Sequence, residues 1–359
     1  MVNPLEIEIS RQIEIDVSSI RRILLTRLRF MGDVILTTPL IRQLRRVFPQ
    51  AHLAYMTEAP YASLLQHNPH LDEIIAIKTR PAGSPWAEVR QQWQLFRDLR
   101  RRQFDLVIDL FGNPRSAQLT WATGARWRVG GDYRGRRWLY TVRVPQNGPH
   151  VDAIAFHQRS LQVIGLNGGD KRTELFLTGA EKQAGAAYLK ACGFSLSAPI
   201  VGLHPGATWP NKIWPAANFA AVARQLMSEG VQVFLTCGPG EEAIVREVRE
   251  HSGGRAVAGD VLPLRKLASI LHHFSGMIAN DCGVMHMAVA VGTPTIGIFG
   301  PGEPDIWFPY DPPHRAFWTD IDCRPCHQNH CPLGTLECMH RIAPEPVAQT
   351  MLHMLKKAA

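Results

Sequence analysis

Short apolar runs alternate with amphipathic segments along the first half of the chain. The segment that begins near Thr38 places its apolar residues on one side and its arginines on the other, as a surface helix does. A second long helix is predicted at 87–102. The apolar runs have the length of buried strands and lie at 22–28, 52–56, 73–77 and 106–109. Repeated strand and helix units predict a parallel sheet that is covered by helices.

The second half of the chain repeats this alternation. Strands are predicted at 200–203, 231–236, 276–279 and 295–299, and helices at 216–229, 242–251 and 284–291. Three strand-to-helix turns, at 204–212, 237–241 and 280–286, would therefore gather at one edge of one parallel sheet. Open α/β sheets bind their ligands at that edge.

Chain length and the positions of glycine and proline predict two domains. A chain of 359 residues, 45% of them hydrophobic, can bury two ordinary cores. Gly, Ser and Pro concentrate in the loop 193–199, after a predicted helix at 180–192, so this loop is a plausible linker. We expect a tail at 1–21, a first α/β domain at 22–192 and a second at 193–359, whose last helix can pack back on the first domain.

Charge predicts an acidic partner. The net charge is +8 and the pI is about 9.3, and nucleic acid, anionic lipid and phosphorylated sugar all suit a basic surface. Residues 1–21 alternate charged and apolar positions without a long apolar run, so we expect no signal peptide and a cytosolic protein. The uncharged window 282–302 is long enough for a membrane span, but its glycines and Pro294 divide it into a helix and a strand.

Two turns in the second half have features of a phosphate site. A helix that starts just after a buried strand, as predicted at 280–288, presents free N–H groups and the positive end of its dipole. Asp281 cannot be the partner of an anion there, but it can hold sugar hydroxyls beside a diphosphate. The alternative is that Asp281 caps the helix and Gly283 makes the turn. The glycine-containing loop 204–212, which ends at Lys212, is a plausible phosphate cradle.

The segment 121–138 interleaves arginines with tryptophans and a tyrosine. Such a segment can bind a phosphorylated or nucleic-acid partner by charge and stacking. The alternative is a solvated loop whose aromatic residues anchor it to the domain. The candidate cations are Arg126, Arg128, Arg134, Arg136 and Arg137.

Four of the seven cysteines cluster near the end of the chain. Their spacing, with histidines nearby, suits structural zinc or an iron–sulfur centre. Reduced thiols in a cytosolic loop are the interpretation that we favour, so no metal site is predicted. The cluster comprises Cys323, Cys326, Cys331 and Cys338.

Four motifs, in this order, resemble those of the ADP-heptose:lipopolysaccharide heptosyltransferases of glycosyltransferase family 9. They are found at 28–39, 204–215, 280–286 and 299–301, and the resemblance extends from about Arg22 to the C-terminus. It implies a GT-B fold, in which two Rossmann-like domains with parallel sheets face each other across a cleft. The acceptor would bind the N-terminal domain and the nucleotide sugar the C-terminal one.

The resemblance also implies an activity. Members of this family move heptose from ADP-L-glycero-D-manno-heptose to the inner core of lipopolysaccharide with inversion, and they use no metal or other cofactor. The partners would be the ADP-heptose donor, the lipid A-core acceptor and the inner face of the cytoplasmic membrane, where the protein would be peripheral. Nucleic acid is not an implied partner, and the motifs do not determine which core heptose is added.

The family motifs also imply roles for individual residues. Asp33 matches the general base, and a carboxylate at the start of a helix stays ionised and available for that task. Its alternative role is to cap the helix that contains Leu40. For His286 the alternative is a core histidine bonded to a carbonyl. The resemblance also implies the donor contacts. Thr208 and Lys212 would contact the diphosphate, Glu241 the ribose, Leu264 the adenine and Asp281 the heptose. Cys282 and Gly283 would supply backbone N–H groups, and His286 would flank the same pocket. The five arginines above are the acceptor candidates.

Other classes of protein remain possible on the sequence alone. A nucleic-acid-binding protein would use the arginines but would have no use for Asp33 or for the three turns. A catalytically silent nucleotide-sugar-binding protein would bind the donor without turnover. A family 9 transferase with another donor sugar would share all four motifs.

Overall fold

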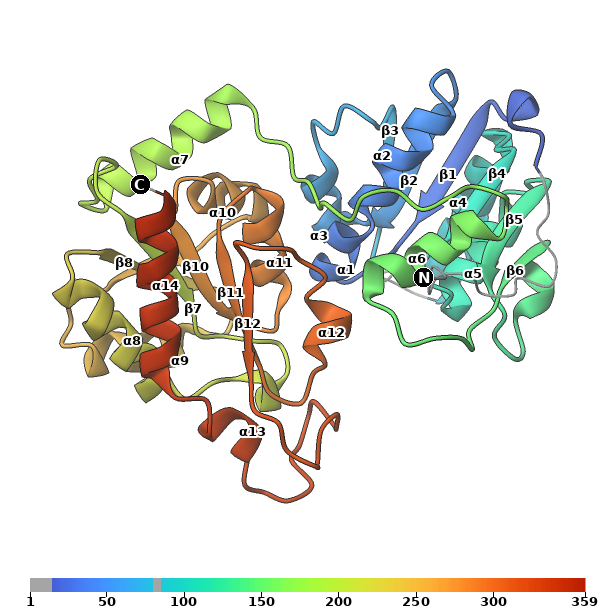
Figure 1. Cartoon of the computed structure of the whole chain (residues 1–359). Coiled ribbons are helices and arrows are strands. Elements are labelled where there is room, and N and C mark those ends of the chain that lie inside the picture. Colours follow the sequence, from blue (N-terminus) through green and yellow to red (C-terminus); the bar gives the residue numbers. More distant parts are fainter. Residues whose placement is uncertain (1–14, 80–84, 359) are drawn as a thin grey trace. The chain divides into compact units, whose positions relative to one another are not determined.

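The chain folds into two compact units, Met1–Thr173 and Glu174–Ala359. The computed structural model describes residues 15–79 and 85–358 (Figure 1). Each unit contains one six-stranded sheet whose paired strands are all parallel. The predicted pair of parallel α/β sheets is therefore confirmed.

Unit 1, the N-terminal unit, has the strand order β3-β2-β1-β4-β5-β6, which is the order of a dinucleotide-binding Rossmann sheet. In the centre of the sheet, Leu24 lies opposite Ala54 on one side and Val107 on the other. The strands are β1 (Arg22–Thr26), β2 (His52–Glu58), β3 (Glu73–Ile77), β4 (Leu106–Asp109), β5 (Trp127–Gly131) and β6 (Val142–Val144).

The helices of unit 1 cover this sheet. Leu99 of α4 and Leu119 of α5 pack against Leu24 and Val107, so both helices cover the same face. Helix α2 begins at Thr38, as predicted, and a separate short helix, α1, precedes it. The helices are α1 (Met31–Leu36), α2 (Thr38–Val47), α3 (Ala59–Ala62), α4 (Pro85–Arg101), α5 (Pro114–Ala122) and α6 (Ala153–Gln162), with short 3₁₀ turns η1 (Val17–Ser19), η2 (Ser63–Leu65) and η3 (Arg137–Leu139).

Unit 2, the C-terminal unit, has the strand order β12-β11-β10-β7-β8-β9. Its strands are β7 (Ile200–His204), β8 (Gln232–Cys237), β9 (Val257–Val261), β10 (Gly276–Asn280), β11 (Thr295–Phe299) and β12 (Arg315–Trp318). Its helices are α7 (Gly179–Ala191), α8 (Ala216–Ser228), α9 (Glu242–His251), α10 (Leu264–Leu271), α11 (Gly283–Ala290), α12 (Pro304–Trp307), α13 (Glu337–His340) and α14 (Pro344–Ala358), with the 3₁₀ turn η4 (Pro210–Lys212).

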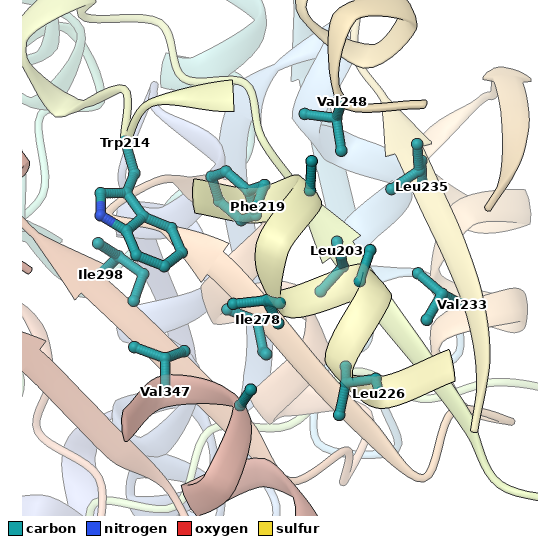
Figure 2. Packing of buried hydrophobic residues seen from close by; sticks show 14 of the residues in the cluster. Leu203, Trp214, Phe219, Leu226, Val233, Leu235, Val248, Ile278, Ile298 and Val347 are labelled. Atoms are coloured by element: carbon teal, nitrogen blue, oxygen red, sulfur yellow. The ribbon is translucent and has the colours of Figure 1, made fainter. Parts of the chain in front are cut away.

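The core of unit 2 is built around a fully buried tryptophan. Trp214 packs edge-on against Phe219, with ring centroids 5.0 Å apart, above Ile278 and Ile298 of the sheet (Figure 2). Its indole N–H donates to the carbonyl of Ile342 at 3.1 Å, so the polar atom is satisfied inside the core. This contact holds the loop after β7 in place.

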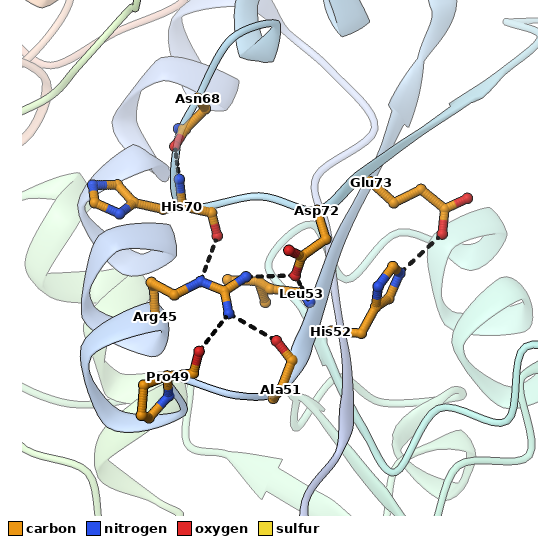
Figure 3. A network of polar contacts seen from close by, with 9 residues as sticks. All are labelled: Arg45, Pro49, Ala51, His52, Leu53, Asn68, His70, Asp72 and Glu73. Atoms are coloured by element: carbon orange, nitrogen blue, oxygen red, sulfur yellow. Dashed lines mark hydrogen bonds and ion pairs between the residues drawn. The ribbon is translucent and has the colours of Figure 1, made fainter.

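A polar network fixes one edge of the unit 1 sheet. The guanidinium of Arg45, near the end of α2, donates to the carbonyls of Pro49, Ala51 and His70 and pairs with Asp72 (Figure 3). An arginine suits the last turn of a helix, where the carbonyl groups lack helical partners. The network ties α2 to the segment that leads into β3.

The boundary between the units falls earlier than the predicted position after residue 192. Helix α7 packs on α10, so it belongs with the C-terminal unit. The Thr178 side chain caps α7, and Glu181 completes the capping box and pairs with Arg265 of α10. The last helix, α14, packs on α8 and β10 of its own unit.

The alternative interpretation of segment 121–138 as a solvated loop does not hold, because the segment contains strand β5 and the turn η3. The window 282–302 forms α11 and β11, as predicted. In the described ranges, no helix has both the length and the apolar character that a membrane crossing requires.

The Glu181 contact predicts a pH dependence of stability. Its ion pair with Arg265 lowers the pKa of Glu181 from 4.5 to about 2. A carboxyl with a lowered folded-state pKa contributes stability above its unfolded pKa and loses that contribution as the pH falls toward the folded value. We expect Glu181→Gln to reduce the free energy of unfolding by about 1–3 kcal/mol at pH 7.

Urea unfolding at several pH values tests this expectation. The difference between parent and variant should shrink as the pH falls from 4.5 to about 2. Glu247→Gln, at an exposed position of α9, is the matched control and should show little difference at any pH. A Glu181→Gln difference that does not change with pH would contradict an electrostatic role.

Candidate active site

Asp33 lies just after β1, in the first turn of α1. One carboxylate oxygen, Oδ1, accepts a bond from Arg27 at 2.5 Å, and the other, Oδ2, accepts from the Phe30 N–H at 3.2 Å. Both charged side chains are largely buried, at 13% and 15% exposure for Arg27 and Asp33. Asp33 therefore caps α1 and not the helix that contains Leu40, and its carboxylate is held in a defined orientation.

Arg27 joins the ends of two neighbouring strands. It follows β1 directly, donates to the carbonyl of Leu110 at 2.8 Å, and lies 4.7 Å from the centroid of the Phe111 ring. Arg27 is not among the site residues predicted from the sequence. An arginine that ends an apolar strand is the signal that could have indicated it, since such a position faces the ligand-binding edge of a parallel sheet.

A buried carboxyl, Asp109, shapes the turn beside Arg27. It accepts bonds from the N–H groups of Phe111 and Gly112 and from the hydroxyls of Ser116 and Tyr140. Burial raises the pKa of Asp109, although these four donors act in the opposite direction. This side chain holds the turn after β4 and was also missed by the sequence analysis.

Strand direction separates the five candidate arginines. Arg126 and Arg128 lie at the start of β5, whereas Arg134, Arg136 and Arg137 follow its end. The ends of parallel strands share an edge, so the latter three lie on the Asp33 side of the sheet. Arg136 donates to the carbonyl of Gly112 at 2.6 Å, beside Phe111.

Local contacts differ among these arginines. Arg128 donates to the carbonyls of Leu139 and Ala125, and Arg126 lies 5.1 Å from the Trp127 ring centroid. Arg137 pairs with Asp132 at 3.1 Å.

A buried ion pair marks the corresponding edge of unit 2. The Lys212 ammonium lies 2.5 Å from Oδ2 of Asp281, and both side chains are at most 10% exposed. Lys212 follows β7 and Asp281 follows β10, and these two strands are neighbours. The predicted diphosphate cation and the predicted sugar-binding carboxylate are thus brought into contact.

Asn280 braces the loop that carries Lys212. Its side-chain N–H donates to the carbonyl of Pro205 at 2.8 Å, and its side-chain carbonyl accepts from the backbone N–H of Trp214 at 3.1 Å. Asn280 is not among the site residues predicted from the sequence. A buried asparagine at the end of a strand is the signal, because its amide must find partners.

Glu241 packs directly on the same loop. Its carboxylate accepts from the Gly238 N–H at 2.7 Å and lies 3.5 Å from the His204 ring. A Cβ at Gly206 would lie only 2.0 Å from the carboxyl carbon, so any larger residue there would displace the Glu241 carboxylate. The three predicted turns therefore meet at one edge, as expected from parallel strands.

His286 of α11 has a different partner from the carbonyl considered above. Its Nδ1 lies 2.7 Å from the Tyr310 hydroxyl. Burial and the positive charge of Lys212 lower the pKa of His286 to about 3. The ring is therefore neutral at physiological pH and adds no charge to the site.

The remaining donor candidates occupy the same edge. Cys282 is the N-cap residue of α11 and Gly283 its first residue. Burial raises the pKa of the Cys282 thiol to about 12, so its backbone, and not a thiolate, is available to a ligand. Thr208 is exposed in the loop after β7, and Leu264 starts α10, directly after the loop that follows β9.

The clustered cysteines line a single small cavity of about 110 Å³. Burial raises the pKa of Cys326 and of Cys338, while N–H bonds, first from Leu336, lower that of Cys331. All seven cysteines are free. Within residues 15–79 and 85–358, no group of three or more His, Cys, Asp or Glu is placed to hold a metal ion.

The contact between Gly206 and Glu241 predicts a measurable coupling. Gly206→Ala should lower the free energy of unfolding by about 1–3 kcal/mol, because the new methyl group displaces the carboxyl. In a Glu241→Ala background the same change should cost less, since the clashing group is absent. Gly179→Ala, where a Cβ meets nothing within 4 Å, is the control. Equal costs in both backgrounds, measured by urea unfolding, would contradict the packing described.

The chain is similar to known proteins in both sequence and fold. The chain is 28% identical to lipopolysaccharide heptosyltransferase 3 of Escherichia coli, over 81% of this chain and 87% of that protein. It is 28% identical to lipopolysaccharide heptosyltransferase 1 of Pseudomonas aeruginosa, over 93% and 98%. A crystal structure of a family 9 glycosyl transferase from Veillonella parvula superimposes with a TM-score of 0.81 and 23% identity, covering 94% of this chain and 97% of that one.

These similarities support the GT-B class that the motifs predicted. The sequence model described as glycosyltransferase family 9 (heptosyltransferase) matches residues 92–337, which is more than half of the chain. The protein therefore belongs to glycosyltransferase family 9, the heptosyltransferase family, and is a glycosyltransferase.

Proposed function

We propose that this protein transfers heptose from ADP-L-glycero-D-manno-heptose to the inner core of lipopolysaccharide, with inversion at the anomeric carbon. The observation that carries the proposal is the buried Lys212–Asp281 pair at the sheet edge of unit 2. It supplies a cation for a diphosphate and a carboxylate for sugar hydroxyls at one point. The curated relatives named above are lipopolysaccharide heptosyltransferases, which supports both the sugar and the acceptor.

Lys212 is the proposed partner of the diphosphate. A diphosphate carries more negative charge than one carboxylate, so it can compete with Asp281 for the ammonium group. Asp281 is then available to accept bonds from heptose hydroxyls. Thr208 and the N–H groups of Cys282 and Gly283 complete the proposed phosphate contacts.

The other donor contacts follow from strand order. Glu241 follows β8, the neighbour of β7, and is the proposed ribose contact. Leu264 follows β9, the next strand, and is the proposed adenine contact. The leaving ADP would be stabilised by Lys212 and by the start of α11, with no metal or cofactor assigned.

Asp33 is the proposed general base. The acceptor hydroxyl attacks the anomeric carbon from the face opposite ADP and gives its proton to the carboxylate as the bond to the ADP oxygen breaks. Arg27 positions the carboxylate through its bond to Oδ1. Arg134, Arg136 and Arg137, on the same edge, are the proposed contacts to acceptor phosphates.

The proposed location of the protein follows from the chemistry of its acceptor. Lipid A is embedded in a bilayer, so the transferase would work at the inner face of the cytoplasmic membrane as a peripheral protein. Incubation with ADP-heptose and truncated lipopolysaccharides of defined length tests the activity. A mass increase of one heptose with release of ADP supports it, whereas ADP-heptose binding without turnover would indicate a silent binding protein.

Replacement of Asp33 tests the base assignment. Asp33→Asn should keep ADP-sugar affinity and lower kcat by a factor of about 10² to 10⁴, the range for loss of general-base catalysis. Asp170→Asn, which removes another arginine-paired carboxylate of unit 1, is the control and should keep near-parental kcat. Near-parental turnover of Asp33→Asn would refute the assignment, since an asparagine still caps a helix.

Replacement of Lys212 tests the phosphate contact. Lys212→Ala should weaken ADP binding by about 1.5–3 kcal/mol, measured by calorimetry, because the diphosphate loses a charged partner. It also leaves Asp281 buried without its cation, so stability should fall. The double variant with Asp281→Asn should recover stability but not ADP affinity. Lys171→Ala, which breaks the Lys171–Asp152 pair, is the control. Parental ADP affinity in Lys212→Ala would exclude a contact between Lys212 and the diphosphate.

A further inference from the structure

Exposed tryptophans gather on one surface of unit 1. Trp86 and Trp93 of α4 are 83% and 69% exposed, Trp121 of α5 is 51% exposed, and Trp138 of η3 is 65% exposed. Helix α5 contacts both α4 and η3, so these elements form one continuous surface beside β4 and β5 (Figure 1). We call this surface, formed by α4, α5 and residues 134–139, the Trp–Arg face.

Two adjoining cavities run along the Trp–Arg face. The larger has a volume of about 930 Å³ and lies along α4 and α5, and the smaller, of about 420 Å³, lies along α5 and η3. Phe96 and Trp121 line both cavities, so they form one hollow. Apolar rings exposed along a hollow of this size mark an interaction surface.

The charged residues that line the two cavities all have one sign. Arg90, Arg97, Arg100 and Arg128 line the larger cavity and Arg134 and Arg136 the smaller, and neither lining contains Asp or Glu. On α4 itself, Asp98 lines a different cavity together with Arg102 and Arg115. Burial, and to a lesser degree the charge of Arg100, lower the pKa of Arg128. This arrangement favours an anionic partner.

We propose that the Trp–Arg face binds the surface of an anionic phospholipid bilayer. Tryptophan rings favour the interface between water and hydrocarbon, and arginines bind the phosphates of anionic headgroups. A helix with these residues lies in the plane of the interface. The proposal rests on the proposed function in one respect, because a lipid-anchored acceptor requires the enzyme to work at a bilayer.

The face is continuous with the edge that carries Asp33. Arg136, which lines the smaller cavity, bonds the carbonyl of Gly112 next to Phe111. The Phe111 ring in turn lies against Arg27, which bonds Asp33. A bilayer bound to the Trp–Arg face therefore places the sugars of an anchored acceptor on the side of unit 1 where the proposed base lies.

Flotation with vesicles that contain no saccharide tests this proposal. The full-length protein should float with vesicles of phosphatidylglycerol and phosphatidylcholine, should float poorly with pure phosphatidylcholine, and should bind less as salt concentration rises. Trp121→Ala should weaken binding about tenfold, as expected when roughly 55 Å² of ring surface no longer leaves water. Trp318→Ala in unit 2, at 50% exposure, is the matched control and should bind as the parent does.

Replacement of single arginines tests how much positive charge contributes to vesicle binding. Arg90→Gln and Arg97→Gln should each weaken binding about fivefold. Arg249→Gln, at an exposed position of α9 in unit 2, should have no effect. All of these variants should transfer heptose to a soluble, deacylated acceptor at the parental rate, so this readout separates membrane binding from the proposed catalytic function.

Three outcomes would overturn the proposal. Equal vesicle binding by Trp121→Ala and Trp318→Ala would show that the Trp–Arg face does not contact the bilayer. Loss of vesicle binding on addition of glycerol phosphate, at the phosphate concentration of the lipid, would indicate a site for free phosphate esters. Salt-sensitive binding to random single-stranded RNA without binding to vesicles would assign the face to nucleic acid.

Discussion

Parallel strand pairing is the constraint on which the rest of this structure depends. Within each described sheet every strand pair is parallel, so the turn after each strand lies at the same edge. Polar side chains can collect there without disturbing the packed faces. In unit 1, Asp33 and Arg27 lie at this edge of the sheet. In unit 2, Lys212, Asp281 and Glu241 lie at the corresponding edge of the second sheet. The polar side chains therefore lie in the loops after the strands, and the apolar faces of the sheets supply the packing that stabilises the fold.

The buried Lys212–Asp281 pair is better explained by binding than by stability. Taking both charges out of water costs several kcal/mol per ion, and their attraction offsets this only with good geometry and further hydrogen bonds. Replacing a buried ion pair by apolar residues of similar volume is often neutral or stabilising. Retaining a cation next to the start of α11 makes sense if an anion binds there, because the positive charge is already desolvated and in place.

Central strands and long helices were predictable, whereas three of the four edge strands, β6, β9 and β12, were not. Central strands such as β1 and β10 are almost completely buried, so their apolar runs are visible in the sequence. Edge strands β9 and β12 are mostly exposed or half-buried, and their sequences resemble loops. Strand β5 was obscured by Trp127, Arg128 and its two glycines, which do not form an apolar run. Helix α7 was assigned to the wrong domain because its partners, such as Arg265, are distant in the sequence.

The sequence by itself determined the α/β class, the order of elements and the residues of the motifs, because hydrophobic periodicity and turn chemistry are local properties. Only the tertiary structure decided which of these residues meet. Lys212 contacts Asp281 because β7 and β10 became neighbours, and Arg126 lies away from Arg136 because a strand separates them. Strand order depends on how whole faces pack against helices from distant parts of the chain, and no local pattern encodes that packing.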